Sequence, residues 1–187
     1  MSERGLNATA ASLLGLLHEG PMTGWDLASL AQRRIGDFWN ITQSQVYREL
    51  AAMTKAGLIE PGTAGPRDRK PYSITDAGRQ AFAAWIDVEP GSEQIRFPLL
   101  VTIMFAGHLS RERLAEMIAA HRARHTERLA DYERQHADLT AAIGPHHDDA
   151  ANEARFQLAT LEFGLRYERA ALDWFDRLPE ILGQPST

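Results

Sequence analysis

The chain has no cysteine, and this absence excludes several kinds of site at once. Disulfide bridges, thiolate nucleophiles, iron–sulfur clusters and cysteine-based zinc sites all need a residue that none of the 187 positions holds. No apolar run approaches the roughly 20 residues that cross a membrane. The N-terminal segment mixes charges of both signs with a short apolar stretch, which makes a poor signal peptide. We therefore expect a cytoplasmic protein without a membrane anchor.

Motifs of catalysis and metal binding are also lacking. The sequence has no glycine-rich phosphate loop, no Gly-x-Ser-x-Gly nucleophile elbow and no His-Glu-x-x-His zinc helix. His121 with His125, and the run His146-His147-Asp148-Asp149, are the histidine clusters, and neither has a converging further ligand. We expect no enzymatic activity, no bound metal and no cofactor.

The charge of the chain is unevenly distributed. Apolar residues make up 44% and charged residues 24%, as in ordinary globular proteins, and the net charge is −5. Through Ile86 there are nine Lys or Arg against eight Asp or Glu, whereas the remainder has eleven against seventeen. A polyanionic partner would therefore meet the first half of the chain.

Short helical signals and one hairpin signal fill the first half. Apolar residues at helical spacing predict a helix that ends at Gly20-Pro21, and Thr23 and Thr42 are cap residues for two further helices. Two strand-like segments, 58–60 and 72–74, flank a Gly/Pro-rich loop, and Thr75 opens a fourth helix with Phe82, Trp85 and Ile86 as its apolar stripe. We also expect Trp39 in the core. This order predicts a mainly helical, α+β winged helix-turn-helix.

Long helices dominate the second half. A helix over 97–105, one from Ser110 to about 143 and one over about 151–178 are predicted. The middle helix has a coiled-coil-like stripe, and the last helix is apolar on two faces, of which a small domain can bury one. The second face indicates a partner subunit. The expected residues of this interface are Ile118, His125, Leu129, Tyr132, Leu139, Phe163, Tyr167 and Trp174.

The segments FWNITQSQVYRELAAMTKAGLIE and GPRDRKPYSITDAGRQAFAAWI resemble the winged-helix domain of PadR-type transcriptional regulators. The resemblance rests on Ser44 and Tyr47, on Gly57-Leu58-Ile59, on the basic loop 67–70 and on the run Tyr72 to Gly78. The second half resembles the helical dimerisation region of longer PadR members. The resemblance implies a homodimer on a pseudo-palindromic operator, commonly a repressor, and in some members a response to small aromatic or drug-like ligands.

The third expected helix and the loop that follows it have chemistry suited to DNA. Glutamine forms paired hydrogen bonds with adenine and arginine with guanine, while serine and tyrosine hydroxyls reach phosphates. From these residues alone, a solvated helix face stays an equal alternative; the loop and the resemblance favour DNA. The predicted DNA contacts are Thr42, Gln43, Ser44, Gln45, Tyr47, Arg48, Lys55, Arg67, Arg69 and Lys70.

We predict three parts: a DNA-binding winged helix over 1–87, a linker over 88–96 and a helical dimerisation and effector region over 97–187. The predicted function is that of a sequence-specific, homodimeric transcriptional repressor of double-stranded DNA, released by a small aromatic ligand whose binding residues the sequence does not show. Two alternatives stay open. One is a winged helix that docks proteins, and the other is a small-molecule sensor that binds no DNA.

Overall fold

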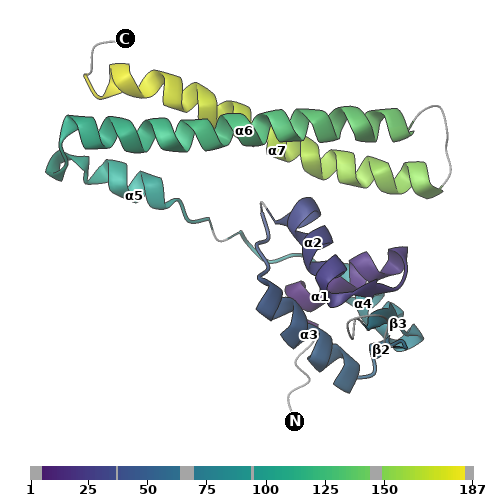
Figure 1. The fold of residues 1–187 in the computed structure, drawn as a ribbon. Helices are drawn as coiled ribbons and strands as arrows, with labels where there is room; N and C mark the ends of the chain where they lie inside the picture. Colours follow the sequence, from purple (N-terminus) through teal and green to yellow (C-terminus); the bar gives the residue numbers. More distant parts are fainter. Residues whose placement is uncertain (1–5, 37, 64–69, 94, 144–148, 184–187) are drawn as a thin grey trace. The chain divides into compact units, whose positions relative to one another are not determined.

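The computed structural model describes residues 6–36, 38–63, 70–93, 95–143 and 149–183, with the backbone alone for 149–151. These residues belong to two units, Met1–Gln94 and Ile95–Thr187 (Figure 1). The helices and strands of the first unit are α1 (Ala8–Leu16), β1 (Met22–Thr23), α2 (Gly24–Ile35), α3 (Gln43–Lys55), β2 (Ile59–Pro61), β3 (Pro71–Ile74) and α4 (Asp76–Ile86), with a 3-10 turn at Leu17–Glu19.

Each helix of the first unit begins at a side chain that caps it. The side-chain oxygens of Asn7, Thr23, Thr42 and Thr75 accept a hydrogen bond from the backbone N–H three residues further on. Such caps satisfy N–H groups that have no partner inside the helix. The three threonine positions confirm the predicted starts of α2, α3 and α4.

The core of the first unit lies among α1, α2 and α3. Val46, Leu50 and Met53 are buried, which confirms the predicted inward face of α3. They pack with leucines of α1 and α2 and with the strand residues Ile59 and Ile74.

One aromatic side chain expected in the core is instead exposed, and so are two residues of the predicted apolar stripe of α4. Trp39 is 42% exposed, and its indole N–H donates to the hydroxyl of Thr9 at 3.4 Å. On α4, Phe82 packs against the core, whereas Trp85 and Ile86 lie outside it. The expectation for Trp39 was wrong because the core of this unit is already filled by aliphatic side chains, most of them from three helices.

A small antiparallel sheet completes the winged helix, with strand order β1-β3-β2. Ile59 pairs with Ile74 and Pro61 with Tyr72, which confirms the predicted hairpin. The third strand, β1, pairs Met22 with Tyr72 and was not predicted, because two residues show no periodicity.

The second unit consists of helices alone among its described residues. They are α5 (Pro98–Met104), a 3-10 turn at Ala106–His108, α6 (Arg111–Ile143) and α7 (Asp149–Ile181). The hydroxyl oxygen of Ser110 accepts from the backbone N–H of Arg113 at 3.2 Å, at the start of α6 as predicted. Figure 1 shows α6 and α7 packed along each other. No helix in the described part of the chain has the length and apolar character needed to cross a bilayer.

Candidate nucleic-acid interface

A capping box defines the start of α3, where the predicted contacts concentrate. The Thr42 hydroxyl accepts from the backbone N–H of Gln45 at 3.3 Å, and the Gln45 side-chain oxygen accepts from the backbone N–H of Thr42 at 2.8 Å. Thr42 and Gln45 therefore both stabilise the helix, and the Gln45 amide oxygen is occupied within the cap. Thr42 was predicted as a cap, whereas this role of Gln45 was not, although the Thr-x-x-Gln spacing is a signal for it.

The first turn of α3 presents polar side chains without a carboxylate. Gln43, Ser44 and Arg48 are exposed, and the first turn contains no acidic residue. The backbone N–H groups at a helix N-terminus favour anions such as phosphate. Arg48 lies 3.6 Å from the carboxylate of Glu49, but its own side chain is 68% exposed, so this ion pair leaves the guanidinium accessible.

Tyr47 is held by close packing against the start of α2. A Cβ on Gly24 would lie 2.6 Å from the Tyr47 ring and 3.1 Å from Leu50, so only glycine allows this approach. The Tyr47 ring is nevertheless 46% exposed. Its position is therefore set by α2 while part of the side chain stays available for contact.

The remaining predicted contacts are spread over other parts of the first unit. Lys55 is exposed at the last turn of α3, and Lys70 is exposed immediately before β3. Arg67 and Arg69 lie outside the described residues. The structure thus brings together the contacts on the first two turns of α3, with Lys55 at the far end of the same helix.

Two of the predicted interface residues on α6, His125 and Tyr132, contact α7 of the same chain. Tyr132 is buried against Gly164, where a Cβ would lie 2.6 Å from the tyrosine ring. Among the other expected interface residues, Phe163 is 73% exposed. The half-buried ones are Ile118, His125, Leu129, Leu139, Tyr167 and Trp174. His125 and Tyr132 therefore pack within the α6–α7 pair, whereas Phe163 of α7 is left uncovered.

A buried carboxylate joins α6 to α7. Glu168 is 1% exposed, and its two oxygens accept from Nδ1 of His125 at 2.5 Å and from Nη1 of Arg128 at 3.2 Å. A buried carboxylate needs such partners because it has lost its water. Glu168 was not among the residues predicted from the sequence, although its spacing is a signal for burial: it lies three residues after Leu165 and four before Leu172, on the apolar stripe of α7.

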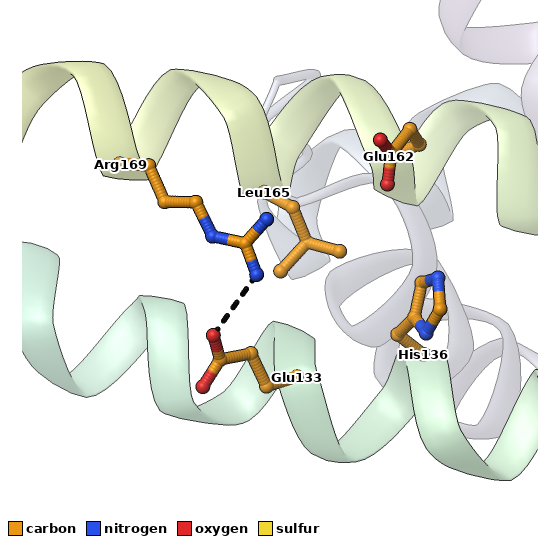
Figure 2. Close-up of a pocket in the computed structure, with 5 residues that line it drawn as sticks. All are labelled: Glu133, His136, Glu162, Leu165 and Arg169. Atoms are coloured by element: carbon orange, nitrogen blue, oxygen red, sulfur yellow. Dashed lines mark hydrogen bonds and ion pairs between the residues drawn. The ribbon is translucent and has the colours of Figure 1, made fainter.

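A hollow of about 170 Å³ lies between α6 and α7 and is lined mainly by charged side chains (Figure 2). Arg169 donates to Glu133 at 3.1 Å, and Leu165 lies beside this pair, with Glu162 and His136 further along the two helices. Among the described residues, no group of three or more His, Asp or Glu side chains is placed to hold a metal ion. The hollow therefore lies beside an ion pair that joins the two helices, next to the apolar side chain of Leu165.

Two family models match adjacent parts of the chain. The PadR-like family of transcriptional regulators matches residues 13–84, and the C-terminal region of virulence activator alpha matches residues 95–183. The first match covers the winged helix and the second covers α5, α6 and α7.

Relatives match along nearly the whole chain. The probable transcriptional regulator Rv1176c of Mycobacterium tuberculosis is 30% identical over 188 residues, with 91% of this chain and 95% of that protein covered. The negative transcriptional regulator PadR of Bacillus subtilis is 26% identical over 171 residues, covering 89% and 93%.

Crystal structures of the Bacillus subtilis protein share the fold. Its complex with operator DNA has a TM-score of 0.76 at 23% identity, covering 97% of this chain and 99% of that one. Its complex with p-coumaric acid has a TM-score of 0.71 at 23% identity, covering 95% and 100%. The winged helix, the paired long helices and the extent of these matches lead to one conclusion: the chain belongs to the PadR-like family of transcriptional regulators.

Proposed function

We propose that this regulator is a homodimeric repressor that binds a pseudo-palindromic operator through α3 and the β2–β3 loop. In this proposal residues 1–87 read DNA, 88–96 link the parts, and 97–187 form the dimer. It acts in the cytoplasm by binding rather than by catalysis. The observation that carries the proposal is the exposed, carboxylate-free first turn of α3 on a winged helix.

The chemistry of α3 supports contact with both bases and phosphates. Gln43 and Arg48 carry the donors that read base edges in the major groove, and Ser44 and Tyr47 carry hydroxyls for phosphate oxygens. A relative in the same family has been crystallised with operator DNA. A recognition helix enters the groove with its N-terminal residues foremost, which is where these side chains lie.

Uncovered apolar surface in the second unit supports a dimer. The helix α5 has no buried residue, and its Met104 is 79% exposed. On α7, Phe156 and Phe163 are seven residues apart and both exposed, so they share one helix face. Apolar surface of this kind marks an interaction site, and a second copy of the same helices matches it in chemistry.

Release by a small ligand is the regulatory part of the proposal. The Bacillus subtilis relative has been crystallised with p-coumaric acid as well as with DNA. In a dimer, a ligand bound among α5, α6 and α7 changes the separation of the two recognition helices, which lie about 34 Å apart on one face of the duplex. Operator affinity then falls without any change in the DNA-reading surface.

Fluorescence anisotropy tests the DNA-binding part. The labelled duplex is the DNA upstream of the protein's own gene, beside a scrambled duplex of equal length, each titrated at several salt concentrations. We expect tight binding to the upstream DNA alone, with an affinity that falls steeply as salt rises because phosphate contacts release counterions.

Other outcomes of the same titration separate the alternatives. Equal, weak binding to both duplexes calls for a selection from random duplexes, and failure to enrich any sequence there overturns operator binding. Binding that does not depend on salt favours a winged helix that docks proteins. A ligand bound tightly by a chain that binds no duplex favours a sensor without DNA.

A further inference from the structure

Glu49 is a carboxylate on α3, one residue after Arg48, to which the proposed function assigns base reading. The Glu49 side chain is 12% exposed, whereas that of Arg48 is 68% exposed. DNA is a polyanion, so a carboxylate on the helix that enters the groove opposes binding. Its two oxygens face two different partners, and these partners indicate what the carboxylate does there.

One oxygen of Glu49 is held by the start of α1. Nδ2 of Asn7 donates to Oε2 of Glu49 at 3.1 Å, between residues 42 positions apart in the chain. Asn7 is itself fixed, because its Oδ1 accepts from the backbone N–H of Ala10 at 2.9 Å as the cap of α1. The Asn7 amide thus uses its oxygen for the cap and its nitrogen for Glu49. The carboxylate is therefore anchored to another helix of the first unit.

The other oxygen of Glu49 faces Arg48. Oε1 of Glu49 lies 3.6 Å from Nη2 of Arg48, which makes an ion pair longer than a hydrogen bond. Successive residues of a helix do not face each other, so the Arg48 side chain bends toward Glu49 to make this contact. With Nη2 directed at Glu49, the other nitrogens of the guanidinium keep their donors for a base edge. Paired donors of this kind read O6 and N7 of guanine.

We propose that Glu49, anchored by Asn7, is a positioning residue that orients the Arg48 guanidinium toward a guanine of the operator. The inference rests on the proposed function, since it requires that Arg48 reads a base. The long Arg48 side chain loses rotamer freedom when it binds, and a partner that restricts it beforehand reduces this loss. The Glu49 carboxylate therefore has two opposite effects. It repels every duplex through its charge, and it favours the operator through Arg48.

Glu49→Gln separates these two effects. The amide keeps an oxygen that accepts from Asn7 but has no charge with which to direct Arg48. Fluorescence anisotropy of the full chain is measured on the operator duplex and on a scrambled duplex of equal length, and the ratio of the two dissociation constants gives the operator preference. We expect Glu49→Gln to bind scrambled DNA about twofold more tightly, because a repelling charge is gone. We expect its operator preference to fall by about three- to fivefold.

Two matched variants show whether a change comes from charge alone or from Arg48. Glu60→Gln removes an exposed carboxylate on β2 of the same unit, and we expect it to change the binding of both duplexes by the same factor. Arg48→Ala removes the guanidinium. Adding Glu49→Gln to Arg48→Ala is expected to lower the operator preference no further, because the side chain that Glu49 orients is absent.

Asn7→Ser tests the anchor and keeps the test decisive where Glu49→Gln does not fold. Serine caps a helix as well as asparagine does, but it lacks the Nδ2 donor that reaches Glu49. We expect the operator preference of Asn7→Ser to fall in the same direction as that of Glu49→Gln, with binding of scrambled DNA unchanged because no charge is removed. Circular dichroism and thermal unfolding show which variants are folded.

Several results overturn the proposal. They are an unchanged operator preference in folded Glu49→Gln, an equal fall in Glu60→Gln, and a further fall when Glu49→Gln is added to Arg48→Ala. An unchanged preference in folded Asn7→Ser overturns the role of the anchor.

Failure of the proposed function gives a different pattern. A wild type that prefers no duplex, or Arg48→Ala with its preference intact, overturns base reading by Arg48 and this inference with it. A wild type that prefers the operator through Arg48, with no effect of Glu49→Gln, keeps the proposed function and overturns the inference alone.

Discussion

Gly78 lies where the first turn of α4 passes the segment that follows α3, and a side chain has no room there. A Cβ at this position would lie 2.1 Å from the carbonyl oxygen of Leu58 and 2.8 Å from Ile74. The same oxygen accepts from the backbone N–H of Thr75 at 3.1 Å and from its hydroxyl at 3.0 Å. It cannot withdraw from Gly78 without breaking contacts at the start of α4.

Gly78→Ala is therefore expected to lower the free energy of unfolding by about 1–3 kcal/mol, the usual range for a side chain forced into filled space. Gly91→Ala is the control, because a Cβ there meets nothing within 4 Å. Urea denaturation followed by circular dichroism measures both variants. Equal stability of the two would show that the backbone around Gly78 yields easily.

Glu168 is the buried charge of the second unit. Glu168→Gln keeps the shape of the side chain but replaces a carboxylate, which binds His125 and Arg128, with a neutral amide. We expect the variant to lose about 1–3 kcal/mol of stability, since hydrogen bonds to a charged group are the stronger kind. Glu162→Gln is the control: its ion pair with Arg166 is exposed and is expected to contribute under about 1 kcal/mol. Matching denaturation midpoints for the two variants would contradict a structural role for Glu168.

At the scale of the element, α3 combines two kinds of contact on one helix. Arg48 lies in the second turn beside the exposed polar residues, and Lys55 lies in the last turn. Arg48→Ala is expected to cost about 1–3 kcal/mol on the operator and to relax its sequence preference, whereas Lys55→Ala weakens all duplexes alike and reduces the salt slope by about one. Anisotropy on operator and scrambled DNA compares them. An equal loss on both duplexes for Arg48→Ala would assign that residue to phosphate.

The elements differ in how far sequence alone predicts them. Helix starts at Thr23, Thr42 and Thr75 were predicted because a capping threonine acts on backbone N–H groups a few residues away. The strand β1 was not, since its two residues are extended only through pairing with β3. The exposed position of Trp39 was missed for a related reason: burial depends on which helices meet, and apolar character does not reveal that.

At the scale of the whole molecule, we predict a dimer that forms through the uncovered face of α7. Phe163→Glu places a charge on the uncovered face of α7. In a two-fold symmetric dimer both protomers carry this charge at the interface, so the loss of burial occurs twice. With about 1.5–3 kcal/mol of burial lost for each phenylalanine, the dimer dissociation constant is expected to rise by at least about tenfold. Sedimentation velocity over a concentration series measures the change, with Ala84→Glu, exposed on α4 in the first unit, as control. An unchanged constant would place the interface on another face.

The sequence by itself determined the winged helix, the two long helices and the candidate contacts at the start of α3. These depend on caps, turns and periodicity, which act between residues close together in the chain. Only the tertiary structure decided which apolar face is covered and which is left free. It buried Tyr132 against Gly164, left Phe163 exposed, and placed Glu168 between His125 and Arg128. The physical reason is that burial and ion pairing between α6 and α7 join residues some 30 to 40 positions apart, and no local pattern specifies those partners.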